Sequence, residues 1–192
     1  MTSEELAPGA FVNDDRRLRT TRLSLRRLRP DDAEPIARQA NDRGVAQMTA
    51  RIPHPYSLAD ARAFVADPGD EFIRAVVLAT DQRLIGVAGL KPRPDGTAVS
   101  LGYWFGREHW GKGYATEVVQ ALVDFAFVSS DIACVCASCR VINGASRRVL
   151  EKCGFQLRRT GILDTASAGR VSVEEYHLDR GTWTALKAWG GK

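Results

Sequence analysis

Apolar and polar residues follow two different periods along this chain. In Arg22–Leu28 apolar and polar residues alternate, which predicts a β-strand with one buried face. In 112–128 the apolar residues recur at helical spacing and form a single stripe, which predicts a long amphipathic helix. The stripe consists of Val118, Leu122, Phe125 and Ala126.

Helix caps and prolines mark where other elements begin and end. Pro30, followed by two aspartates, predicts a helix over 33–40. Ser57 and Asp60 have the spacing of a capping box for a helix that runs to about 67. Two prolines in Arg51–Tyr56 exclude regular structure there. The expected strands are 22–28, 71–80, 84–90, 97–105, 132–139, 154–163 and 170–178, and the expected helices are 33–40, 57–67, 112–128 and 144–153.

This order of elements predicts an α/β fold in which one central mixed β-sheet is flanked by helices. The chain has 192 residues, of which 44% are hydrophobic, and this is enough for one globular domain with a sizeable core. We expect a single domain at 18–192 after a flexible N-terminal arm at 1–17. No internal repeat or linker in the sequence divides the domain.

Charge and hydropathy argue against several classes of function. The net charge of +4 is mild and the arginines are scattered, so no nucleic-acid partner is expected. No apolar run approaches the roughly 20 residues that a bilayer-spanning helix needs, so no membrane partner is expected. Residues 1–15 carry four acidic side chains and no apolar segment typical of a signal peptide, which favours a cytoplasmic location.

The four cysteines invite a comparison with zinc sites. Cys134, Cys136 and Cys139 lie in the expected strand 132–139, and Cys153 follows later. The alternation of a strand places Cys134 and Cys136 on one face and Cys139 on the other. Because the paired Cys-x-x-Cys turns of structural zinc sites are absent, we interpret the cysteines as small buried thiols in a reducing compartment, and we expect no metal.

The segment Gly102–Glu117 carries the strongest indication of chemistry. It comprises the end of a strand, a short turn and the first residues of the long helix. A helix N-terminus has unpaired N–H groups and partial positive charge, which suit an anion. Gly111 and Gly113 lack a Cβ, so a phosphate can approach the backbone closely. The sequence therefore predicts a phosphate-binding turn at the end of this strand.

Two kinds of phosphate-binding turn fit these glycines. Gly106–Lys112 satisfies Gly-x-x-x-x-Gly-Lys, the core of the P-loop of magnesium-dependent phosphotransferases. The residue after that lysine should be Ser or Thr, whose hydroxyl holds the magnesium ion, and here it is Gly113. We also find no apolar strand that ends in an aspartate suited as the second magnesium ligand. A magnesium-dependent phosphotransferase is therefore disfavoured.

The other pattern, in Trp110–Ala115, resembles the pyrophosphate-binding turn of the GNAT superfamily of acyl-CoA-dependent N-acetyltransferases. Three further segments resemble the RimJ/RimL-like branch of that family, and they are Thr20–Ala33, Pro53–Phe64 and Asn143–Phe155. The resemblance covers about residues 18–186. A glycine pattern alone is weak, but four segments in the right order make the resemblance specific.

This resemblance implies a GNAT-like fold whose central sheet splays open between the strands 97–105 and 132–139. It implies that acetyl-CoA lies in the opening as co-substrate, with its pantetheine arm paired to the first strand and its pyrophosphate on the turn. The residues at the matching positions are Tyr103, Trp104 and Phe105 in the strand, Trp110, Gly111, Lys112, Gly113, Tyr114, Ala115 and Thr116 in the turn, and Asn143 beside the pantetheine arm. From the residues alone, Asn143 could instead cap the next helix, and the side chains of 103–105 are interpreted as core.

Acetyl transfer to an amine needs a base for the amine, hydrogen-bond donors for the carbonyl oxygen and an acid for the departing thiolate. The resemblance implies that a backbone N–H near Phe105 is such a donor. Many relatives use a tyrosine as the acid, at the position that Leu150 holds here, whereas RimL-like relatives use a serine that matches Ser146. Alternatively, Ser146 satisfies backbone donors in the first turn of its helix. The acid that many relatives carry at the position of Ser100 is absent. The candidates for the base are Asp164, Glu174, Glu175, His54 and His109, and deprotonation through water is a further alternative.

We therefore expect an N-acetyltransferase that moves an acetyl group from acetyl-CoA to a primary amine by direct transfer in a ternary complex. The acceptor would be a small-molecule amine or a peptide amine such as a protein N-terminus. The missing tyrosine leaves a non-catalytic acyl-CoA-binding or sensing module as the alternative. The segments 41–56 and 160–172 would shape the acceptor pocket and carry no diagnostic motif. The two tryptophans of Thr182–Trp189 favour a homodimer, unless they pack on their own domain.

Overall fold

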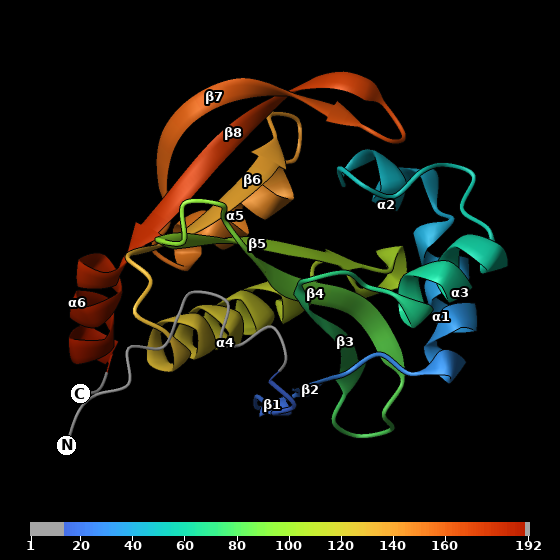
Figure 1. Cartoon of the computed structure of the whole chain (residues 1–192), viewed down its shortest axis with the longest axis horizontal. Coiled ribbons are helices and arrows are strands. Elements are labelled where there is room, and N and C mark those ends of the chain that lie inside the picture. Colours follow the sequence, from blue (N-terminus) through green and yellow to red (C-terminus); the bar gives the residue numbers. More distant parts are fainter. Residues whose placement is uncertain (1–13, 191–192) are drawn as a thin grey trace.

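The computed structural model describes residues 14–190, which form one α/β domain around an eight-stranded sheet (Figure 1). The strand order is β1-β2-β3-β4-β5-β6-β8-β7, and within this sheet β5 and β6 are the parallel pair. The strands are β1 (Leu18–Arg19), β2 (Leu23–Arg26), β3 (Phe72–Leu78), β4 (Leu84–Pro92), β5 (Ala98–Phe105), β6 (Cys134–Arg140), β7 (Gln156–Thr165) and β8 (Gly169–Asp179). The helices are α1 (Ala33–Ala40), α2 (Arg43–Gln47), α3 (Leu58–Ala66), α4 (Tyr114–Ser129), α5 (Gly144–Lys152) and α6 (Arg180–Gly190).

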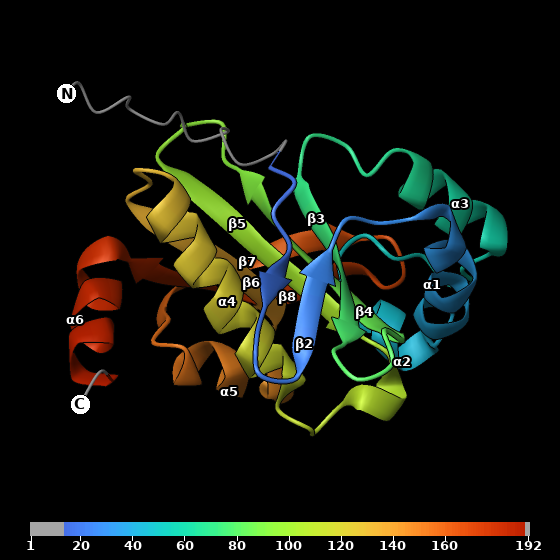
Figure 2. The same ribbon diagram turned by 90° about the horizontal axis from the view of Figure 1, so that it is seen from below.

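Helices cover both faces of the sheet (Figure 2). On one face, α4 and α5 pack against the strands through apolar residues such as Leu122 and Leu150, which are almost completely buried. On the other face, α1 and α3 cover β3 and β4, and Ile36, Ala61 and Val77 belong to a second, smaller core there. The predicted mixed sheet with flanking helices is confirmed, and the predicted stripe of α4 lies in the larger core.

The N-terminal arm that we expected at 1–17 lies mostly outside the described residues. Its residues 14–17 lie against the domain. Arg16 Nη2 donates to Ser129 Oγ at the end of α4, at 2.9 Å, and Arg17 Nε donates to Ser24 Oγ of β2, at 2.6 Å. The buried Arg74 of β3 donates to the backbone carbonyl of Asp14.

The predicted helix starts are partly confirmed. α3 has the expected capping box, in which Ser57 and Asp60 bond each other's backbone N–H groups. The long helix begins at Tyr114 and not at Lys112 as expected, because Gly113 has a φ of +78° and left-handed backbone cannot continue into a right-handed helix. The strand expected at 132–139 runs instead from Cys134 to Arg140.

Two helices were not predicted. α2 has only five residues, and the side chain of Asp42 caps it by accepting from the backbone N–H of Val45 at 3.1 Å. Its length is too short for apolar periodicity to show. α6 follows β8 without a turn, and Trp183 attaches it to α4, where the indole lies 5.1 Å from the ring of Phe127 and donates to Asp124. One of the two C-terminal tryptophans therefore packs on its own domain.

The sheet opens between its two parallel strands. β6 pairs with β5 only from Ala98 to Leu101, whereas β4 pairs with β5 from Val99 to Phe105. The last four residues of β5 therefore have a neighbouring strand on one side only. α4 follows β5 and α5 follows β6, so both helix N-termini lie at the same edge of the sheet as this opening. The predicted splay of the sheet is confirmed.

Candidate active site

The open edge of β5 presents main-chain hydrogen-bonding groups. Just after β5, the N–H of Gly106 donates to the backbone carbonyl of Ile85 in β4 at 3.0 Å. Along an antiparallel pair, residues bonded in this way alternate with residues whose N–H and C=O point outward. By this alternation Tyr103 and Phe105 direct main-chain groups into the opening. In agreement, the Phe105 carbonyl accepts a hydrogen bond from Trp110 Nε1 at 2.7 Å.

The aromatic side chains at the end of β5 mainly build the cores, as interpreted from the sequence. Phe105 is buried, and the ring of Tyr103 lies 6.2 Å from it in the larger core. Trp104 packs against the smaller core on the opposite face of the sheet. A ligand in the opening would therefore meet the backbone of this strand more than its rings.

The turn after β5 leaves the start of α4 open. Gly111 and Gly113 have φ values of +74° and +78°, which glycine adopts without strain. In the described part of the chain no side chain caps α4, and its first backbone bond runs from the N–H of Glu117 to Gly113 at 3.3 Å. The N–H groups of Tyr114, Ala115 and Thr116 therefore have no acceptor one turn back. This arrangement suits a phosphate group.

An arginine that the sequence did not single out lies beside this helix start. Arg22 Nε pairs with Glu117 Oε2 at 2.8 Å, and Arg22 Nη1 donates to the carbonyl of Lys112 at 2.9 Å. Burial alone would raise the pKa of Glu117, but hydrogen bonds from Thr20 and Arg22 bring it below its ordinary value. Glu117 is thus ionised and paired, and the exposed Lys112 adds positive charge to the turn.

The N-terminus of α5 carries the two polar candidates of the sequence. Asn143 Oδ1 accepts from the backbone N–H of Ser146 at 3.1 Å, so Asn143 is the N-cap of this helix. The hydroxyl of Ser146 instead bonds the phenol of Tyr103 across the opening, with 2.8 Å between the oxygens. Among the hydrogen bonds of the described residues, Ser146 Oγ thus has this phenol as its partner, and Asn143 is the side chain that accepts from a backbone donor at the start of α5.

Tyr103 brings a phenol close to Ser146, and no sequence signal links these two positions. Leu150, where many relatives carry a tyrosine, is only 1% exposed and belongs to the larger core. Burial raises the pKa of Tyr103 to about 12, although its bond to Ser146 acts in the opposite direction. The Tyr103–Ser146 pair therefore consists of two neutral hydroxyls at neutral pH.

The structure does not bring Asp164 to this pair. Asp164 lies exposed on β7, opposite Arg170 of β8. Its neighbours Leu163 and Thr165 line a small cavity beside Cys139, so strand alternation points Asp164 away from that cavity.

The other candidates for the base are held by hydrogen bonds, buried, or located in an exposed loop. Glu174 is buried and accepts from Arg147 and Tyr176, and Glu175 accepts from Arg93, Arg159 and His177. His109 is only 6% exposed, and burial lowers its pKa. His54 lies exposed in the loop before α3.

The two segments expected to shape an acceptor pocket lie side by side. Ala166 N–H donates to the carbonyl of Ala50 at 2.9 Å, and Ser167 Oγ donates to the carbonyl of Ala46, also at 2.9 Å. Between them lies a cavity of about 40 Å³ next to β6. It is lined by Met48, Thr49, Ala50, Ser138, Cys139, Arg140, Leu163, Thr165 and Val173.

The split mixed sheet and the uncapped helix start at its opening are what the resemblance to acyl-CoA-dependent transferases implied, and comparison with known proteins agrees. A family described as "Acetyltransferase (GNAT) domain" matches residues 22–156. The chain belongs to this GNAT acetyltransferase family and is an acetyltransferase. In residues 14–190 we find no helix with the length and apolar character needed to cross a membrane.

Individual relatives are distant. The chain is 29% identical over 147 residues to the N-acetyltransferase p20 of Bacillus licheniformis, covering 72% of this chain and 82% of that protein. A GNAT-family acetyltransferase from Bacillus anthracis superposes with a TM-score of 0.76 at 22% identity, over 85% of this chain and 98% of that one. RimL, a ribosomal α-N-protein acetyltransferase solved with coenzyme A, superposes with a TM-score of 0.70 at 20% identity, over 85% and 98% of the chains.

Proposed function

We propose that this enzyme transfers the acetyl group of acetyl-CoA directly to a primary amine, with both substrates bound together in the opening between β5 and β6. The observation that carries the proposal is the combination of the unpaired end of β5 with the uncapped start of α4. Main-chain groups on one side and a helix N-terminus on the other suit a long ligand that ends in phosphates.

Different groups around the opening would bind different parts of acetyl-CoA. The N–H groups at 114–116, with Gly111 and Gly113 beside them, would hold the pyrophosphate. The outward main-chain groups of Tyr103 would pair with the pantetheine arm. The carbonyl of Phe105 is already engaged by Trp110, and its N–H is the donor we assign to the oxygen of the thioester.

Ser146 is the group we assign to protonation of the departing thiolate. Its hydroxyl lies at the opening, and Tyr103 holds it in place from β5. A thiol with a pKa near 8.5 gives a good leaving group, so a hydrogen bond from the neutral hydroxyl to the sulfur is sufficient help as the C–S bond breaks. If the hydroxyl transfers its proton to the sulfur, the proton that the acetylated nitrogen loses restores it. Two of the carboxylates that we considered as the base, Glu174 and Glu175, are held in ion pairs with arginines. We therefore propose that the amine loses its proton through water.

The acceptor would approach from the cavity between the loop after α2 and the β7–β8 hairpin. We expect a small-molecule amine or a peptide N-terminus, and the likeness to RimL supports the second class. We expect the enzyme to act in the cytoplasm as a homodimer. Trp189, which is 86% exposed, supports the dimer, and light scattering that finds only monomers at high concentration would contradict it.

A panel of amines and short peptides, assayed for acetyl-CoA-dependent release of free thiol in the presence of EDTA, tests the reaction and identifies the acceptor class. Gly111→Ala tests the turn, with Gly69→Ala as its matched control. Both glycines have φ near +75°, and an added Cβ meets no atom within 4 Å at either position. Both variants should lose about 1 kcal/mol of stability through backbone strain.

Only Gly111→Ala should weaken the binding of coenzyme A, at least tenfold, because its Cβ would occupy the approach of the phosphate. Equal affinity of the two variants for coenzyme A in calorimetry would contradict the assignment of the turn. If acetyl-CoA binds but no amine in the panel causes release of free thiol, the result would favour the alternative, a non-catalytic module that binds or senses acyl-CoA.

A further inference from the structure

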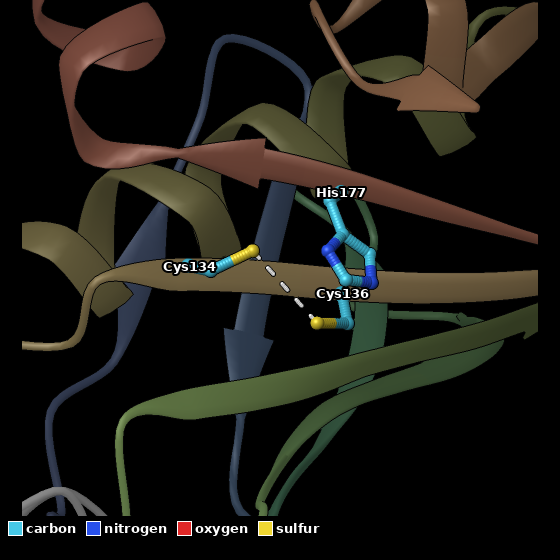
Figure 3. Close-up of side chains that lie close together, drawn as sticks. All are labelled: Cys134, Cys136 and His177. Carbon is cyan, nitrogen blue, oxygen red and sulfur yellow. Dashed lines mark hydrogen bonds between the residues drawn. The ribbon is translucent and has the colours of Figure 1, made fainter. Parts of the chain in front are cut away.

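Three possible metal ligands meet on the face of the sheet that turns away from the larger core (Figure 3). Cys134 and Cys136 lie on this face of β6, whereas Val135 and Ala137 point into the larger core. β8 runs antiparallel to β6 and places His177 directly opposite Cys136. The sequence showed the cysteine pair but not this histidine, which tertiary pairing supplies from a distant strand.

The distances fit a tetrahedral zinc ion. The two sulfur atoms are 3.8 Å apart, and the sulfur atoms and one imidazole nitrogen all lie within 4.8 Å of one another. Zinc–sulfur bonds of about 2.3 Å at tetrahedral angles require the sulfurs to be about 3.8 Å apart. The same geometry requires about 3.5 Å between sulfur and nitrogen, so His177 would move by roughly 1 Å. Its side chain is 30% exposed and has room to do so.

The histidine already has the outer partner that zinc-binding histidines use. Its Nε2 lies 3.1 Å from Glu175 Oε1, and Figure 3 shows the other ring nitrogen on the side of the Cys134 sulfur. Arg93 and Arg159 hold Glu175 in turn. A carboxylate oxygen that accepts from Nε2–H favours the tautomer in which Nδ1 is free to bind a metal.

We propose that Cys134, Cys136 and His177 bind one Zn²⁺ ion, with water as the fourth ligand. Binding converts two thiols into thiolates and releases up to two protons, and the two thiolates then balance the charge of the ion. Asp179 lies opposite Cys134, but its carboxylate bonds the N–H and hydroxyl of Thr182 at the start of α6, so it does not supply the fourth ligand. The site is separate from the opening that we assign to acetyl-CoA.

Titration of the reduced full-length protein with Zn²⁺ against a chromogenic chelator tests this proposal, and Co²⁺ reports the ligands by its spectrum. We expect one ion per chain and a sulfur-to-cobalt charge-transfer band with tetrahedral d–d bands. Cys134→Ser and Cys136→Ser should each lower the zinc affinity at least about 100-fold and remove the charge-transfer intensity of that sulfur. His177→Ala should lower the zinc affinity roughly 10- to 100-fold. Glu175→Gln should lower it by a similar factor, because Glu175 accepts the hydrogen bond that orients His177.

Cys153→Ala is the matched control, because this thiol lies in the larger core next to α4 and should leave the zinc affinity unchanged. A second measurement uses the wild-type chain, so its result does not depend on whether the variants fold. Zn²⁺ should protect Cys134 and Cys136 from alkylation, as read by mass spectrometry, and should leave the rates at Cys139 and Cys153 unaltered. Equal alkylation with and without Zn²⁺, or a cobalt spectrum without thiolate bands, would overturn the proposal.

Discussion

The pair of hydroxyls at the opening can be dissected by removing each member in turn. Ser146→Ala deletes the Oγ that we assign to proton transfer but keeps the backbone N–H that Asn143 caps, so the start of α5 stays intact. Tyr103→Phe deletes the other half of the 2.8 Å hydrogen bond and leaves the Ser146 hydroxyl in place. The two variants therefore remove the same bond and differ in which hydroxyl remains.

The stability effects follow from burial. Ser146→Ala leaves the phenol of Tyr103 without this partner, which should cost about 1–3 kcal/mol, and Tyr103→Phe should cost about 1 kcal/mol. Because the variants share one bond, the double variant should be less destabilised than the sum by about 1 kcal/mol. In a chain of this size each kcal/mol lowers the melting temperature by about 2–4 °C.

The catalytic effects should differ. Ser146→Ala should lower kcat roughly tenfold to a hundredfold, less than the full range of general acid catalysis because a thiolate leaves readily. Tyr103→Phe keeps the acid and should lower kcat only about threefold, through looser positioning of Ser146. Neither variant should change the affinity for coenzyme A, because neither side chain is assigned to its binding.

Steady-state rates at saturating acetyl-CoA, measured beside thermal melts and calorimetry with coenzyme A, provide all these quantities. An unchanged kcat in Ser146→Ala together with a lower melting temperature would assign the serine to structure alone. A larger loss of kcat in Tyr103→Phe than in Ser146→Ala would identify the phenol as the acid.

Three further predictions concern other parts of the molecule. Asn143→Ala should cost about 1 kcal/mol by loss of the helix cap and should also weaken coenzyme A in calorimetry; a change in stability alone would restrict Asn143 to capping. Asp32→Ala should cost about 3–5 kcal/mol in urea unfolding, because it strands the largely buried Arg26 that binds it through two hydrogen bonds of 2.7 and 2.8 Å. Burial raises the pKa of Tyr103 and Tyr176 to about 12, above the value near 10 in an unfolded chain, so these phenols support stability fully below pH 10 and lose that support as the pH rises toward 12. Tyrosinate absorbance for these two side chains should therefore appear only together with the loss of far-UV circular dichroism.

Local physical rules were sufficient for most elements and for the glycine turn before α4. The apolar stripe of α4, the capping box of α3 and the glycines before α4 each depend on residues close in sequence, so their interactions can be inferred from spacing alone. The same rules misplaced the start of α4 by two residues, since the left-handed backbone of Gly113 shows only in the folded chain. They missed α2, which is too short to show a period.

Contacts between distant strands and helices decided the rest. The bond between Tyr103 and Ser146 depends on how far β5 and β6 splay, and the meeting of Cys136 with His177 depends on the register of β8 against β6. The engagement of Glu174 by Arg147 likewise joins α5 to β8. A side chain's spacing along the chain says which face it occupies, but its partner on another element is set by packing and strand register, and these exist only once the whole sheet has formed.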